Sequence, residues 1–101
     1  MPKLYEYFGL TVFFYSNEHE PIPVHGLYGD RESKAEILIV NGKIKRIRFL
    51  EVTGRPPLTG SHLADFKKIV QLRAEDIVRK WIDYFVLNKR VKPERITRKL
   101  Q

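Results

Sequence analysis

The sequence predicts an α+β domain, a small antiparallel β-meander of about four strands followed by one or two amphipathic helices that pack on one of its faces. Two observations lead to this fold class. Short runs of β-branched and aromatic residues fill the first half of the chain, and apolar residues recur every three or four positions after Ser61. A chain of 101 residues buries enough surface for one core but not for two. We therefore expect a single domain over 1–101, with the meander in 1–52, the helical part in 61–87 and a basic tail in 88–101.

Three short strands are expected in the first part of the meander. Residues 10–15 are β-branched or aromatic at nearly every position, which is typical of a strand. A polar, proline-bearing loop follows, and further strands are expected over 24–28, closed by a Gly-Asp turn, and over 34–40. Because proline cannot donate to a ladder, Pro23 predicts an edge position for the second of these strands.

The strongest local signal is Asn41-Gly42 between two apolar runs, which predicts a two-residue type I′ hairpin. Three apolar side chains of the next strand, over 43–50, are spaced by three and then by two residues: Ile44, Ile47 and Phe49. A bulge near Lys45 and Arg46 would place all three on one face and would turn Arg46 and Arg48 outward.

The second half reads as helical after a loop over 52–60, which contains two prolines and two glycines. We expect a helix, or two consecutive ones, from Ser61 to about Leu87, with Ser61 as the N-cap and Asp65 in the first turn. The pattern itself does not fix a break, although one near Arg73 is compatible with it. The apolar stripe comprises Leu63, Phe66, Val70, Ala74, Ile77, Trp81 and Tyr84.

Charge is distributed unevenly along the chain. Residues 1–42 hold three Lys and Arg against six Asp and Glu, whereas 43–101 hold sixteen against six, so the two parts carry −3 and +10 of the net +7. Such asymmetry favours a polyanion, an acidic protein or an anionic membrane surface as partner. A merely solubilising surface is the alternative. Because the tail over 88–101 lacks a wide apolar face, we expect no membrane partner.

Composition also limits the chemistry. The absence of cysteine excludes disulfides, thiolate zinc sites and cysteine nucleophiles. The apolar run over 8–15 is too short to span a bilayer and is not followed by a cleavage site, so we expect a cytoplasmic protein.

Candidate chemical groups gather around the loop after the first predicted strand. Glu18, His19 and His25 lie within eight positions of one another, and a histidine beside carboxylates can serve as general acid or base. Three cations from neighbouring strands would hold a phosphate and stabilise its charge: Lys34, Arg46 and Arg48. Each group also has a plain structural interpretation, in which the glutamates are solvated loop charges and His25 caps a packed face.

A metal centre would need three or four converging ligands, and Glu18, His19 and His25 reach three only if the loop folds back. We therefore predict that the protein uses no metal and no cofactor.

The same loop carries a resemblance to a known family. Residues 14–25 read Phe-Tyr-Ser-Asn-Glu-His-Glu-Pro-Ile-Pro-Val-His, a Tyr-Gly-Asp turn follows, and residues 80–85 read Lys-Trp-Ile-Asp-Tyr-Phe. Over residues 1 to about 87 the chain resembles a family of small bacterial proteins known as domain of unknown function 4160. Members are often encoded beside a second small protein, in an arrangement similar to a toxin and antitoxin pair. The resemblance implies a toxin-like protein neutralised by a small antitoxin-like partner.

One departure from the family pattern bears on chemistry. The family has histidine where this chain has Pro23, and in an extended strand that position and His25 face the same side, about 7 Å apart. Either the first histidine is dispensable, or this copy has lost an activity.

Two function hypotheses follow. In the first, the protein is a toxin-like component that acts on RNA by metal-independent acid and base chemistry, with Glu18, His19 and His25 as the site. In the second, it is a non-catalytic module whose positive surface binds nucleic acid or an acidic partner protein. The sequence leaves open whether the protein is an enzyme.

Overall fold

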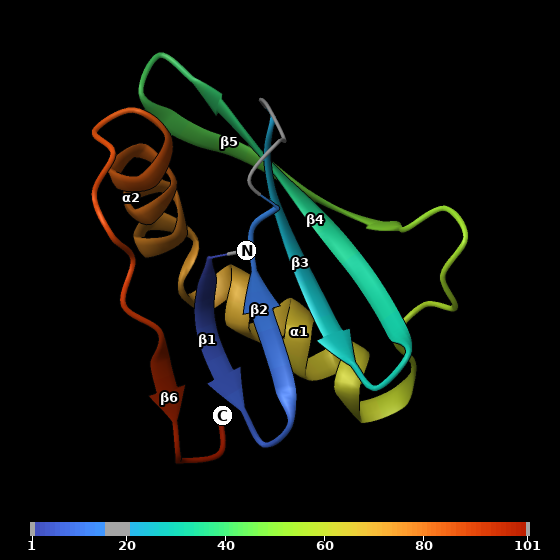
Figure 1. Cartoon of the computed structure of the whole chain (residues 1–101). Helices are drawn as coiled ribbons and strands as arrows, with labels where there is room; N and C mark the ends of the chain where they lie inside the picture. The colour runs from blue at the N-terminus through green and yellow to red at the C-terminus, as the bar shows by residue number, and fades with distance from the viewer. Residues whose placement is uncertain (1, 16–20, 101) are drawn as a thin grey trace.

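The computed structural model describes residues 2–15 and 21–100, which form one sheet and two helices (Figure 1). The predicted α+β class is confirmed. Neither helix of the described part has the length and hydropathy that crossing a membrane requires. The elements, in chain order, are β1 (Lys3–Tyr7), β2 (Leu10–Phe13), β3 (Ile22–Tyr28), β4 (Arg31–Val40), β5 (Lys43–Glu51), α1 (Gly60–Leu72), α2 (Ala74–Phe85) and β6 (Glu94–Ile96).

The sheet has the order β5-β4-β3-β2-β1-β6. Strands β1 to β5 form an antiparallel meander, and β6 joins β1 in parallel. The meander is thus longer than the four strands expected, because residues 3–7 pair with β2 and were not recognised as a strand. The C-terminal tail is also part of the sheet: Ile96 is buried opposite Tyr7, and the Leu100 N–H donates to the Tyr7 hydroxyl at 3.2 Å.

The β4–β5 hairpin forms as predicted. Asn41 and Gly42 both have positive φ, at 52° and 78°, as a type I′ turn requires. The register moves from Leu38 opposite Arg46 to Ile39 opposite Ile44, so Lys45 is the extra residue of a bulge. This bulge is the one that the spacing of the apolar residues predicts.

Both helices cover the same face of the sheet, with α1 and α2 behind the strands in Figure 1. Gly26 of β3 is the closest point of this contact, because a Cβ added there would lie only 2.5 Å from the Phe66 ring of α1. The same ring meets Phe49 of β5 edge to face, and Phe85 of α2 packs on Phe14. The core is therefore a sheet and helix sandwich with one helical layer.

The helical boundaries differ in detail from the prediction. Helix α1 begins at Gly60 with Thr59 as N-cap, and Asp65 lies beyond the first turn. Thr59 is extended, and its carbonyl accepts the Leu63 N–H, so the N-cap lies two residues before the predicted one at Ser61. A break does occur at Arg73. Helix α2 then carries two acids in its first turn, Glu75 and Asp76, where they interact favourably with the positive end of the helix dipole.

The predicted edge position of Pro23 is wrong, because β3 lies between β2 and β4. The pairing of β2 with β3 ends at Phe13 opposite His25. Pro23 lies beyond that point and pairs with Glu36 of β4 alone. The missing N–H therefore leaves no gap in the β2–β3 ladder, and an interior strand tolerates proline here.

Helix α2 is tied to β1 by a buried polar contact. The Tyr5 hydroxyl donates to the Asp76 carboxylate, and Lys80 lies 3.0 Å from the same carboxylate and 4.3 Å from the centre of the Tyr5 ring. Burial raises the pKa of Asp76, but hydrogen bonds from Tyr5 and Lys80 outweigh burial, and the net pKa lies below its usual value. Burial and the same carboxylate hold the pKa of Tyr5 well above its ordinary range.

We predict that Tyr5→Phe lowers the free energy of unfolding by about 1–3 kcal/mol at pH 7, since it removes a hydrogen bond to a charged acceptor. Because the folded pKa of Asp76 is lowered, its contribution is complete above the unfolded pKa of about 4 and is lost as pH falls through the folded value. Urea titrations of wild type and variant should therefore converge in acid. Tyr84→Phe, a half-buried tyrosine of α2, serves as control and should cost under about 0.5 kcal/mol. Equal losses in both variants, or a loss independent of pH, would contradict the role of this contact.

Candidate functional site

The candidate site lies on the second face of the sheet, which neither α1 nor α2 covers. Because side chains alternate along a strand, the residues beside Gly26, which faces α1, point to this second face. The registers then place Phe13 of β2, His25 of β3 and Lys34 of β4 in one row across it. Phe13 is fully buried, and its ring stacks on the imidazole of His25 with 5.5 Å between centroids.

A buried carboxylate is the centre of this site. Glu32, only 1% exposed, accepts a hydrogen bond from the Tyr15 hydroxyl at 2.9 Å and lies 2.9 Å from Nδ1 of His25, which is 3% exposed. A carboxylate can only accept, so Nδ1 of His25 carries the proton in this contact. The Tyr15 ring also meets the imidazole edge to face at 4.5 Å. The three side chains form one hydrogen-bonded cluster, hereafter the Tyr15–Glu32–His25 cluster.

The loop between β5 and α1 supplies a cation to the cluster. Arg55 Nε lies 3.7 Å from Glu32 Oε1, and its side chain is about half exposed, at 47%. The loop is held there by backbone contacts, since the Glu32 N–H donates to the Pro56 carbonyl and the Leu58 N–H donates to Ser33 Oγ. Arg55 is therefore the link between the buried carboxylate and solvent.

This arrangement orients an imidazole. A carboxylate on Nδ1 fixes the ring plane and the tautomer of the imidazole. Such a pair suits general acid and base chemistry. The same contacts equally satisfy the buried Glu32 and His25 side chains and the partly buried Tyr15 hydroxyl, and they join β3 and β4 to the segment just after β2.

The predicted site residues are brought together in part. His25, Lys34, Arg46 and Arg48 all lie on the second face, in neighbouring strands. Arg48 is not a free cation, because its Nη2 donates to Glu36 at 2.7 Å. Glu18 and His19 lie outside the described residues, so their roles stay predictions, as do those of His25 and the three cations.

Of the three residues in the cluster, the sequence predicts only His25 as a site residue. Tyr15, Glu32 and the neighbouring Arg55 are not among the predicted site residues. A signal for Glu32 was present, because the Gly-Asp turn that ends β3 pairs Tyr28 with Arg31 and so places Glu32 diagonally from His25. No comparable signal exists for Arg55, which reaches Glu32 from a loop.

Within residues 2–15 and 21–100, no three His, Asp or Glu side chains are grouped to hold a metal ion. Glu18 and His19 lie outside these residues, so the prediction of no metal at that loop stays a prediction.

Comparison with known proteins bears on the family. The family described as Domain of unknown function (DUF4160) matches residues 9–82, about three quarters of the chain. The chain belongs to this family. No curated protein and no solved structure matches it.

The DUF4160 match includes the whole Tyr15–Glu32–His25 cluster together with Arg55. It excludes β1 and β6, which form the other end of the sheet. Pro23 lies two positions before His25 on the second face, opposite Glu36, which pairs with Arg48. A histidine at 23 would thus lie between the imidazole of His25 and an existing carboxylate and guanidinium pair.

We predict that Glu32→Gln lowers the free energy of unfolding by about 1–3 kcal/mol, because one amide oxygen replaces two carboxylate oxygens as acceptor for buried groups. Urea titration measures the loss. Nitrogen NMR of the imidazole should show Nδ1 of His25 protonated in the wild type and a changed signal in the variant. Glu36→Gln on the same face is the control. Because the Arg48 side chain of this ion pair is 53% exposed, the substitution should lower the free energy of unfolding by under about 1 kcal/mol. A wild-type imidazole with an unprotonated Nδ1 would refute the assigned contact.

Proposed function

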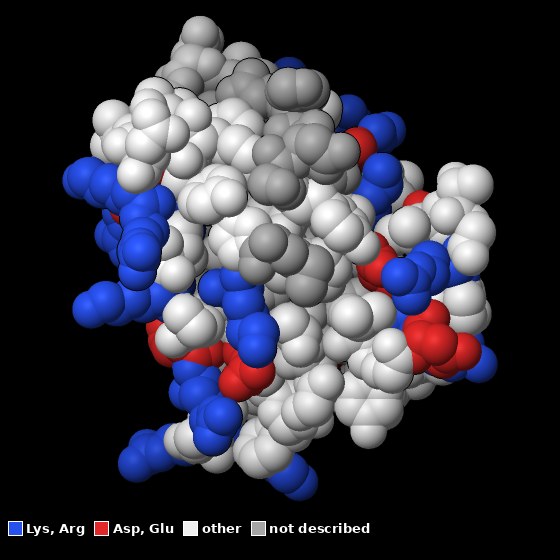
Figure 2. Space-filling view, viewed as in Figure 1, with Lys and Arg blue, Asp and Glu red and all other residues white. Residues whose placement is uncertain are grey.

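We propose that this protein is a toxin-like component of a two-protein system and that it binds RNA through the second face of its sheet. The observation that carries the proposal is the location of the surplus positive charge. Exposed cations lie on β5, at one edge of the sheet, and in the tail around β6, at the other edge. Figure 2, which looks onto this face, shows Lys and Arg on both sides of it. The residues concerned are Lys43, Lys45, Arg46 and Arg48 on β5, and Lys89, Arg90, Lys92, Arg95, Arg98 and Lys99 in the tail.

Most of these cations remain available for a ligand. Among the described residues, only Arg48 and Arg95 of this set have a carboxylate within 4.0 Å, on Glu36 and Glu6 respectively. Five strand spacings separate the two edges, about 24 Å at the usual spacing between strands. A flexible polyanion that crosses the face would therefore meet positive charge at both ends of its path. This geometry favours single-stranded RNA over a compact anionic ligand.

The toxin-like role rests on the resemblance to the family, and the small antitoxin-like protein is part of the same proposal. Charge complementarity supports it, because an acidic protein that covers the second face would exclude RNA. Expression of the chain alone should slow bacterial growth. The double variant Lys34→Ala, Arg46→Ala should relieve that effect.

Binding of a short single-stranded RNA, followed by fluorescence anisotropy at several salt concentrations, tests the proposal. The double variant Lys34→Ala, Arg46→Ala should bind less tightly, and the slope of log affinity against log salt should fall by about 1.4, or 0.7 for each lost phosphate contact. Lys67→Ala with Lys68→Ala removes the same charge from α1 and should leave the slope nearly unchanged. Equal effects of the two pairs would mean that RNA responds to net charge only, and the proposed face would be wrong.

A second candidate function is acid and base catalysis on RNA, which the contact between His25 Nδ1 and Glu32 favours. The carboxylate would orient His25 as acid or base, and Arg55 with Lys34 would stabilise charge on the phosphate. The burial of His25 and Glu32 weighs against this candidate, because a general base must come within hydrogen-bond reach of its substrate. Binding without catalysis is therefore the function that the geometry supports best.

Incubation of a mixed RNA pool with chelator, followed by electrophoresis, separates the two candidates. We expect intact RNA with the wild type, and also with Pro23→His, which restores the family's histidine beside His25. Cleavage by Pro23→His that His25→Asn abolishes, in variants that stay folded by circular dichroism, would instead establish catalysis and identify Pro23 as the cause of its loss.

A further inference from the structure

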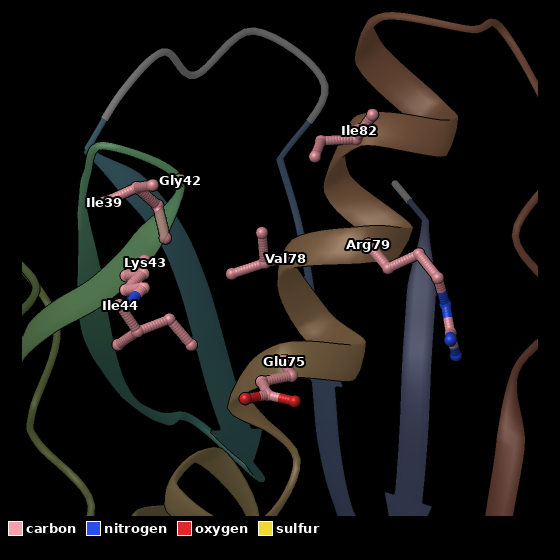
Figure 3. A pocket seen from close by; sticks show the side chains of 8 residues that line it. All are labelled: Ile39, Gly42, Lys43, Ile44, Glu75, Val78, Arg79 and Ile82. Atoms are coloured by element: carbon pink, nitrogen blue, oxygen red, sulfur yellow. The ribbon is translucent and has the colours of Figure 1, made fainter.

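A groove separates the tip of the β4–β5 hairpin from helix α2, away from the second face. Its volume is about 560 Å³. Figure 3 shows Val78 and Ile82 of α2 pointing toward Ile39 and Ile44 of the hairpin across it. The predicted site residues that the structure describes, His25 and the three cations, do not line this groove. The lining residues are Ile39, Gly42, Lys43, Ile44, Glu75, Val78, Arg79 and Ile82.

The groove marks the place where the helical layer ends. Ile37 and Ile39 share one face of β4, and Ile37 is fully buried whereas Ile39 is only partly buried. Ile82, in the facing wall, is 41% exposed, and Val86 continues the same row of α2 at a spacing of four. A sheet face of this kind is normally covered by helices along its length. Within residues 2–15 and 21–100, no helix covers the position beside α2 and over the end of β4 and β5.

The charge around the groove indicates what would cover it. Lys43 of the hairpin lines the groove, and Lys45 follows it at the bulge, whereas Arg46 belongs to the second face. Among the described residues these cations have no carboxylate within 4.0 Å, whereas Arg79 is already paired with Asp76. Glu75 at the opposite wall is the single acid of the lining. A second copy of this chain, with net charge +7, would be repelled here, and RNA would find no aromatic side chain to stack on.

We propose that this groove docks an acidic amphipathic helix of a partner protein, lying beside α2 over the β4–β5 hairpin. The partner helix inserts apolar side chains between the Ile39–Ile44 and Val78–Ile82 walls, and its carboxylates face Lys43 at the rim of the groove. The proposal does not depend on RNA binding. Lys43 could contact either ligand, but the apolar walls of Ile39, Ile44, Val78 and Ile82 belong to the groove alone.

The experiment selects binders from a displayed library of random helical peptides with the full chain as bait. Enriched peptides should be net acidic, with apolar residues three and four positions apart. Anisotropy titration of the best peptide should show affinity about tenfold or more weaker for Ile82→Glu, as for a central contact, and several-fold weaker for Lys43→Glu. Leu72→Glu, an exposed leucine of α1 outside the groove, is the matched control and should bind like the wild type.

Other results would overturn the proposal. These are enrichment of basic or non-amphipathic peptides, equal binding to the Ile82→Glu and wild-type chains, or failure to enrich any peptide. Self-association in sedimentation that Ile82→Glu abolishes would assign the groove to a second copy. Loss of RNA binding in Ile82→Glu would assign it to RNA. Unchanged RNA binding in Ile82→Glu, together with lost peptide binding, keeps the two functions separate.

Discussion

The buried carboxylate of Glu32 is the contact on which the candidate site depends. It joins Tyr15, just after β2, to His25 of β3, and its partner Arg55 connects both to the loop before α1. A carboxylate removed from water is costly unless its oxygens accept hydrogen bonds, so these segments are held in place by the need to satisfy it. The orientation of the His25 imidazole follows from that requirement. The same requirement explains why a polar cluster can exist next to the fully buried ring of Phe13.

The two faces of the sheet are specialised for different contacts. Gly26 faces the helices, and the Phe66 ring lies directly on β3 there. The isoleucines of β4 and β5 and Phe49 pack on the same side. The alternate residues of the same strands point to the second face, among them His25, Arg46 and Arg48. The bulge at Lys45 keeps this division intact along β5, because without it Ile44 would exchange faces with its neighbours. Positive charge and apolar core are thus separated by strand register alone, and the groove beside α2 opens where the helical layer ends.

How far the sequence predicts this structure depends on how local each signal is. The type I′ turn, the bulge and the helical period are set by neighbouring residues, and all three were predicted correctly. Strands β1 and β6 were missed because each is defined by its partner. Glu94-Arg95-Ile96 has no strand character until it lies beside Tyr5 and Tyr7. The Tyr15–Glu32–His25 cluster was predicted only at His25, since Glu32 reaches it diagonally across a hairpin and Arg55 from a loop.

The parallel pairing of β1 with β6 links positions 89 apart in the chain, Tyr5 and Glu94. During synthesis on the ribosome, one edge of β1 therefore has no pairing partner until residues 94–96 have emerged. An uncovered strand edge can pair with other chains, so this interval is the time when the nascent protein is most prone to aggregate. Ribosome pausing before residue 94 would lengthen the exposure. The sheet is completed late, by a strand that is distant in sequence from its partner. The rate of translation therefore affects how this small domain folds.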